Sequence, residues 1–326
     1  MLRQVSTSAP TRASNSSCKP NLLRSGSEYF LTPPSPGSQP IRLKTGRVEQ
    51  RNWSRVGSAV MSNAVGDRKG KRVFVKQYVD SLGSWHDAIW SNEWAAAEIA
   101  TQLLYGIVHV PENLCSDQSM RVNVFEYLDV ITPDKLLRRD SECFERMFPT
   151  LLLGAQRLLG RLQDGSAKSF LPRELAAKRR DFGGPSVAVN FKGLEVRNVG
   201  FRLDDKGEVG PALVVFDFGS AYLAPIEEAA AKLYISVGLL NWGKPLQRFA
   251  KGPDLSLLAR CRESLDDYLD SDALQAELHL QKSFRMAEVH GHNRVERAMK
   301  RFVIHHLGAD YLQKLEGWCL AEFSSR

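Results

Sequence analysis

The sequence predicts an α+β protein in two lobes, with a small antiparallel β-sheet lobe before a larger helical lobe and a disordered N-terminal tail. Three observations predict this class. Residues 1–45 are rich in Ser and Pro, residues 46–79 consist of short apolar runs separated by turn formers, and much of the chain after residue 133 has helical periodicity. With 326 residues and 43% hydrophobic content, the chain can bury a substantial core.

The tail, residues 1–45, contains nine serines and six prolines, and Glu28 is its only acidic residue. Such a segment cannot bury enough apolar surface to offset the entropy of ordering it, so we predict that it is disordered. Its composition resembles an organelle transit peptide and also the export signal of a bacterial secreted effector; a plain solvated tail is the third interpretation. The compartment of the protein therefore stays open.

The charge distribution argues against a nucleic-acid-binding protein. The net charge is +7, and residues 1–50 contribute +5 of it, from seven Lys or Arg and two Glu. The rest of the chain carries the remaining charge of +2 and is therefore close to neutral. No apolar run approaches the ~18 residues that cross a bilayer, so no transmembrane segment is predicted. The five cysteines are widely spaced and include no Cys-x-x-Cys pair, which favours reduced thiols over a disulfide framework or a zinc site.

The sheet lobe is predicted to occupy residues 46–128. Residues 58–65 and 72–79 are its clearest strands, joined by a turn. Lys76 lies inside the second of these strands on the same face as Phe74. A lysine in a half-buried strand needs an anionic partner.

A helix and a further strand complete this lobe. Residues 90–104 are rich in Ala and predict a helix, with Ser91 or Asn92 as its N-cap. Residues 121–128 form an apolar run that predicts a strand leading out of the lobe.

The helical lobe is predicted to occupy residues 129–326. Residues 148–162 form a helix that is apolar enough to be its central core element, and residues 225–242 and 254–322 predict further helices.

A β-hairpin in this lobe, within residues 194–219, carries the strongest functional signal. Residues 199–203 are short and partly alternating, residues 212–216 are an apolar run, and turn formers separate the two segments. Asp217 follows the apolar run directly. Asn198 and Asp217 are equidistant from a turn centred between residues 207 and 208, so their side chains are predicted to lie side by side. Carboxamide and carboxylate oxygens are ligands that Mg²⁺ takes when it bridges phosphates. A hairpin with a merely hydrophilic open end is the alternative interpretation of this segment.

Asn198 and the run Asp217-Phe-Gly219 resemble the catalytic-loop Asn and the Asp-Phe-Gly motif of the protein-kinase-like superfamily. Within this superfamily the chain more closely resembles the compact branch that includes aminoglycoside phosphotransferases, Rio kinases and lipopolysaccharide-core kinases. This resemblance implies a bilobal kinase-like fold, ATP and Mg²⁺ as cofactors, and Asn198 and Asp217 as catalytic residues that hold the metal.

The same resemblance assigns roles in the sheet lobe. It implies that Lys76 binds the α and β phosphates of the nucleotide and that Glu98 pairs with Lys76, with Glu93 as the second choice. Glu126 and Leu128 fall in the segment that resembles the hinge binding adenine.

The chain departs from the family at the catalytic base. Relatives carry His-x-Asp-Leu where this chain has Phe191-Lys-Gly-Leu194, so Gly193 stands at the position of the usual Asp. Glu195 and Asp181 are the nearest carboxylates. Three functions stay open: a phosphotransferase acting on a protein or small-molecule hydroxyl, a pseudokinase that binds nucleotide as a regulatory protein, and an AMP transferase.

Overall fold

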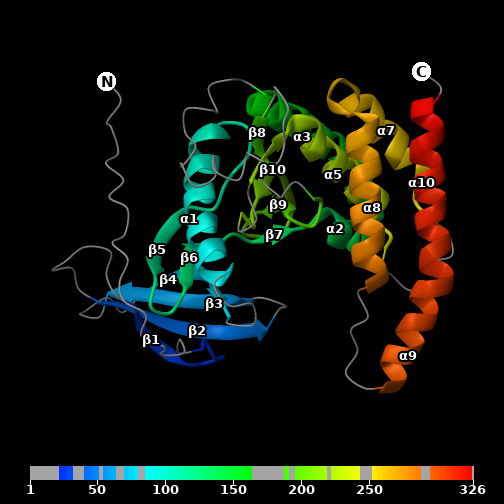
Figure 1. Cartoon of the computed structure of the whole chain (residues 1–326). Helices are drawn as coiled ribbons and strands as arrows, with labels where there is room; N and C mark the ends of the chain where they lie inside the picture. Colours follow the sequence, from blue (N-terminus) through cyan, green and yellow to red (C-terminus); the bar gives the residue numbers. More distant parts are fainter. Residues whose placement is uncertain are drawn as a thin grey trace.

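The computed structural model describes residues 22–31, 40–50, 54–63, 70–79, 85–163, 187–190, 195–218, 222–242, 252–287 and 294–324. Figure 1 shows a mixed fold in which the first part of the chain forms a curled sheet with one helix against it, and the later part is mainly helical.

The first part is a six-stranded antiparallel sheet with the order β1-β2-β3-β4-β6-β5. Helix α1, Trp85–Leu103, packs against β4, β5 and β6. The strands are β1 Glu28–Leu31, β2 Ile41–Gln50, β3 Ser54–Asn63, β4 Lys71–Tyr78, β5 Asn113–Asp117 and β6 Val122–Glu126.

The prediction of a disordered tail over residues 1–45 is wrong for residues 22–31 and 40–45. Leu23, Leu31 and Leu43 are fully or almost fully buried in the core of the sheet, and β2 crosses the predicted boundary at residue 45. The four residues of β1 alternate between exposed and buried positions, as expected for a strand with one face on the core. They pair with β2 although the surrounding sequence is rich in Ser and Pro. Residues 1–21 and 32–39 lie outside the described part.

The predicted start of α1 is also wrong. The helix begins at Trp85, so Ser91 and Asn92 lie inside it and neither is the N-cap. Ser91 is exposed and Asn92 is half-buried, and either residue inside a helix costs at most about 0.7 kcal/mol relative to Ala.

The second part contains two small sheets and the remaining helices. One sheet has the order β10-β9-β7, and the other pairs β11 with β8. The strands are β7 Val130–Ile131, β8 Val187–Asn190, β9 Val199–Leu203, β10 Val209–Val215 and β11 Tyr222–Pro225. The helices are α2 Pro133–Arg139, α3 Ser141–Gln163, α5 Ile226–Gly238, α7 Leu255–Leu265, α8 Ser271–Ala287, α9 Arg294–Val303 and α10 Ala309–Ser324, with a 3₁₀ turn η4 at Asp266–Tyr268 and a π turn η5 at Ile304–Gly308.

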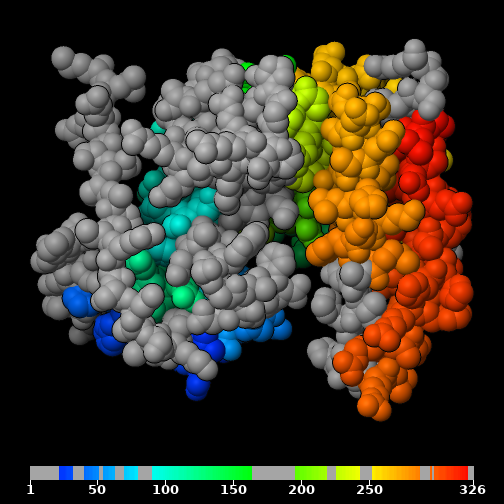
Figure 2. Space-filling view, viewed as in Figure 1, coloured from blue at the N-terminus to red at the C-terminus, as the bar shows by residue number. Residues whose placement is uncertain are grey.

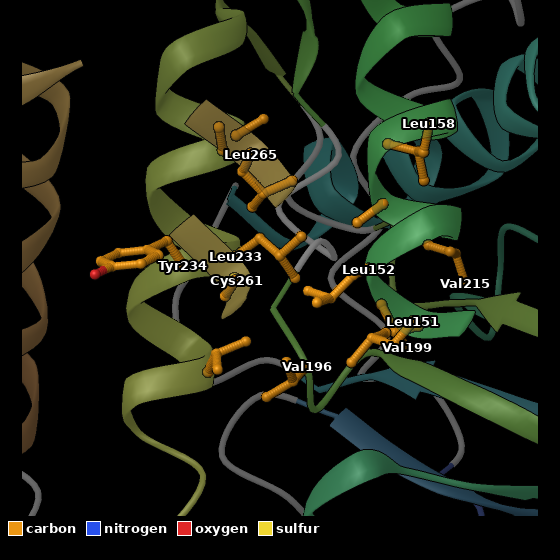
Figure 3. Packing of buried hydrophobic residues seen from close by; sticks show 14 of the residues in the cluster. Leu151, Leu152, Leu158, Val196, Val199, Val215, Leu233, Tyr234, Cys261 and Leu265 are labelled. Atoms are coloured by element: carbon orange, nitrogen blue, oxygen red, sulfur yellow. The ribbon is translucent and has the colours of Figure 1, made fainter. Parts of the chain in front are cut away.

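The hairpin of β9 and β10 rests on the core of this second part. Figure 3 shows Leu151 and Leu152 of α3, Val199 and Val215 of the hairpin, and Leu233 of α5 within one packed cluster. The predicted central helix at 148–162 is confirmed inside α3. The packing fixes the end of the hairpin at which Asn198 and Asp217 lie.

The hairpin is confirmed, but its predicted register is wrong by one residue. Val199 pairs with Val215, and the Phe216 amide donates to the Asn198 carbonyl at 3.0 Å, so Asn198 faces Phe216 rather than Asp217. The main cause is the turn: Leu203 pairs with Val209, so the hairpin folds about residue 206 rather than between residues 207 and 208. An irregularity between Val209 and Leu213, where β10 has two more residues than the facing part of β9, offsets most of this difference. A count from the turn cannot detect such an insertion.

Buried thiols predict that the fold loses stability in alkaline solution. Burial raises the pKa of Cys115 to about 11 and that of Cys319 to about 12, and it also raises the pKa of Cys261. Above about pH 9 the unfolded chain loses thiol protons that the folded chain keeps, so the free energy of unfolding falls as pH rises. Three thiols give a slope of about 4 kcal/mol per pH unit.

Urea unfolding at a series of pH values around pH 9 to 10 measures this slope. The variant with Cys115, Cys261 and Cys319 all replaced by Ala should lose most of the slope, although its stability at neutral pH is lower. An equal slope in both proteins would show that other groups cause the alkaline loss.

Candidate active site

Lys76 is the centre of a buried ion-pair cluster. It lies in β4, in the middle of the sheet, between Val56 of β3 and Asn123 of β6. Its side chain is 11% exposed, and its ammonium nitrogen lies 2.8 Å from Glu93 Oε1 and 2.6 Å from Asp217 Oδ1. Lys76 therefore has two anionic partners where the sequence predicts the need for one: Glu93 from α1 and Asp217 from the end of β10.

Glu93 is held on both of its oxygens. Its side chain is only 2% exposed. Oε1 accepts from Lys76, and Oε2 accepts a short hydrogen bond from the Tyr78 hydroxyl. Tyr78 lies two residues after Lys76 in β4, and the centroid of its ring is 5.1 Å from the Lys76 nitrogen, within cation–π range.

The electrostatics keep Lys76 charged. Burial by itself lowers the pKa of Lys76, but the carboxylates of Asp217 and Glu93 outweigh it and raise that pKa well above the ordinary value. Burial and Glu93 raise the pKa of Tyr78, so its hydroxyl stays protonated and continues to donate. The cluster therefore persists as an ammonium between two acids across the physiological range.

Asp217 is the exposed member of the cluster. Its side chain is 48% exposed, in contrast to Lys76 and Glu93. Its φ angle of +69° lies in the left-handed region, which few residues other than glycine adopt and which Asp tolerates better than most. Strained backbone of this kind is concentrated at functional sites.

Asn198 lies at the same end of the hairpin. Its amide donates to the Glu195 carbonyl at 2.8 Å, which closes a turn directly before β9, and its carbonyl accepts from Phe216. Asn198 is half-buried. The structure thus brings Asn198 next to the residue that precedes Asp217, although the two do not form a cross-strand pair.

The preference for Glu98 as the partner of Lys76 is wrong, and Glu93, the second choice, makes the ion pair. Glu98 is exposed. Five residues along an α-helix rotate a side chain by about 140°, so the two glutamates cannot both face β4. With α1 beginning at Trp85, Glu93 is the one on the sheet side.

The proposed hinge residues lie where β6 ends. The Glu126 amide donates to the Glu112 carbonyl, and its carboxylate lies 3.0 Å from His109 Nε2. Leu128 is half-buried in the short stretch between β6 and β7. Their role in adenine binding remains a prediction.

His109 and Tyr78 were not singled out from the sequence. The backbone of His109 bridges to β10, with its amide donating to the Leu213 carbonyl at 2.7 Å and its carbonyl accepting from the Val215 amide at 2.9 Å. No sequence pattern marks this contact. Tyr78 could have been found, because strand alternation puts it on the face of Lys76.

Glu195, the carboxylate nearest to position 193 in the sequence, is buried and paired. It is 4% exposed, and its Oε2 lies 2.5 Å from Arg197 Nε. Gly193 and Asp181 lie outside the described residues.

The donor set fits a metal ion that is completed by phosphate. Within the described residues, no three His, Cys, Asp or Glu side chains are grouped so that they could hold a metal by themselves. Mg²⁺ commonly takes only one or two carboxylates and receives other oxygens from water and substrate phosphates. Asp217, with Asn198 nearby, meets that lower requirement.

Comparisons with known proteins return a structural likeness only. No protein-family model matches the sequence, and no curated protein matches it either. Among solved structures, the chain is similar to amicoumacin kinase hAmiN in complex with AMP-PNP, Ca²⁺ and Ami, with a TM-score of 0.44 and 12% identity over 91% of this chain and 90% of that one.

Proposed function

We propose that this protein is a kinase-like phosphotransferase that binds ATP with Mg²⁺ and transfers a phosphoryl group to a protein or small-molecule hydroxyl. One observation carries the proposal: the buried Lys76 ammonium is held between Glu93 and the half-exposed Asp217. Three chain segments, β4, α1 and the end of β10, supply these groups. A purely structural ion pair does not require a second, exposed carboxylate on a strained backbone.

Each residue has a role in this proposal. Lys76 binds nucleotide phosphates, Glu93 orients its ammonium, and Tyr78 fixes Glu93. Asp217 and Asn198 would hold Mg²⁺, which when bound neutralises charge on the phosphates. Phosphoryl transfer depends mainly on positioning and charge neutralisation, so the glycine at position 193 does not by itself rule it out.

A second candidate function is nucleotide binding without phosphoryl transfer, as in a pseudokinase. Two observations favour it: Gly193 can neither accept a proton nor orient a hydroxyl, and Glu195 is buried against Arg197. Mass spectrometry of the reaction products separates both candidates from AMP transfer.

Calorimetric titration with ATP, with and without Mg²⁺, tests the site, and mass spectrometry after incubation with Mg²⁺ and ATP tests the reaction. Mg²⁺-dependent binding with ADP formation or an added phosphoryl group supports the phosphotransferase. Binding without products supports the pseudokinase, and an AMP adduct identifies a transferase of nucleotidyl groups. Absence of nucleotide binding would contradict all three.

A further inference from the structure

Helix α9, Arg294–Val303, is not packed into the body of the protein. Every side chain that the structure describes from residue 294 to residue 302 is exposed. Figure 1 shows α9 extending beyond the end of α8, and Figure 2 shows its surface at the lower edge of the molecule. α9 continues through η5 into α10, so its helical form is maintained by the longer helix while these side chains stay exposed.

One side of α9 is an exposed apolar stripe. Val295, Met299 and Phe302 are 69%, 65% and 67% exposed. With 3.6 residues per turn, these three side chains lie within about 60° of one another around the helix axis. Large apolar side chains gathered in this way mark an interaction surface, whereas single exposed ones do not.

Outside the stripe, α9 carries four basic residues and one acidic residue, so its charge is +3. The basic residues are Arg294 and Arg301 on one side of the stripe, Lys300 on the other side beyond the position of Glu296, and Arg297 opposite it. Long basic side chains beside an apolar stripe can extend toward an anionic surface while the stripe is buried. The partner should therefore combine negative charge with an apolar interior.

We propose that α9 binds the surface of an anionic lipid bilayer. The stripe is a convex ridge of three side chains, which is too small for a stable protein complex with some 20–30 residues on each side. A bilayer needs only shallow insertion of a few apolar groups together with electrostatic attraction. A second copy of the chain does not fit, because it would bring two basic helices together.

The attachment is expected to be peripheral. No helix in the described part of the chain is both long and apolar enough to span a bilayer. A helix with a strongly basic side and a narrow apolar stripe lies in the plane of the headgroups. Binding should therefore be reversible and should weaken as salt shortens the range of the attraction.

The test is co-sedimentation of the full-length protein with vesicles. Vesicles of equimolar phosphatidylcholine and phosphatidylserine should bind the protein, whereas vesicles of phosphatidylcholine alone should bind it on the order of tenfold less. Raising the salt to about 1 M should remove most of the difference. Equal binding to both vesicle types, or none to either, would overturn the proposal.

Two pairs of substitutions locate the contact. Met299→Glu with Phe302→Glu should reduce binding to the phosphatidylserine vesicles on the order of tenfold or more. Phe30→Glu with Tyr105→Glu makes the same change in charge at two other exposed apolar side chains, which are 62% and 85% exposed, and should leave binding unchanged. An equal loss in both variants would show a general charge effect and overturn the assignment to α9.

Light scattering of the protein without lipid tests whether a second copy of the chain, rather than lipid, covers the apolar stripe of α9. A monomer supports the lipid proposal. A dimer that Met299→Glu with Phe302→Glu dissociates would overturn it in favour of a second copy. Because all four substituted side chains are exposed, circular dichroism should show the wild-type fold in both variants.

Discussion

Replacing Glu93 by Ala is expected to lower the free energy of unfolding by about 3–5 kcal/mol. The substitution removes an almost fully buried carboxylate that accepts from both Lys76 and Tyr78. It leaves Lys76 largely buried, with the half-exposed Asp217 as its remaining partner in the cluster. Urea unfolding measured by circular dichroism gives the change directly.

Glu98→Ala is the matched control for this prediction. Glu98 lies on the same helix, carries the same charge and is exposed, so its replacement should change the free energy of unfolding by no more than about 0.5 kcal/mol. If Glu98→Ala destabilised the protein as much as Glu93→Ala does, Glu93 could not be the partner that holds Lys76.

Asp217→Asn is expected to abolish Mg²⁺-dependent nucleotide binding, with a loss of affinity on the order of 100-fold. The carboxamide keeps the shape of the side chain but removes the charge that attracts a divalent ion. Because the side chain is 48% exposed and Lys76 keeps Glu93, the fold should remain intact. Calorimetric titration of ATP with and without Mg²⁺ measures the effect.

The control for this substitution is Asp205→Asn at the other end of the same hairpin. Asp205 is exposed near the turn, so the change in net charge is identical while the cluster around Lys76 is untouched. Unaltered Mg²⁺-dependent binding in Asp217→Asn would refute the metal site. Asp217 is a cleaner probe than Lys76, since removing Lys76 strands the buried Glu93 and destabilises the fold as well.

Local patterns in the sequence were sufficient to predict the strand that carries Lys76, the hairpin, and the helix at residues 148–162. Each of these depends on alternation or helical spacing within a short segment, which the sequence displays directly. The position of Asp217 at the end of an apolar strand was equally local. These elements supply most of the candidate site.

The wrong predictions concern features that neighbours in space determine. Whether Glu93 or Glu98 faces β4 depends on the rotation of α1, which packing against the sheet sets. The hairpin register depends on where the turn folds and on an irregularity in β10, and neither is marked in the sequence. Residues 28–31 form a strand only because β2 is available to pair with them.

Two backbone hydrogen bonds of His109 connect the chain segments that carry Glu93 and Asp217, the two acids that contact Lys76. His109 follows α1, which carries Glu93, and it is bonded on both its amide and its carbonyl to β10, which ends before Asp217. A shift of α1 that reaches His109 therefore either breaks these two bonds or moves the end of β10. Amide hydrogen exchange at His109 and Val215 should report on this connection between the segments that carry Glu93 and Asp217.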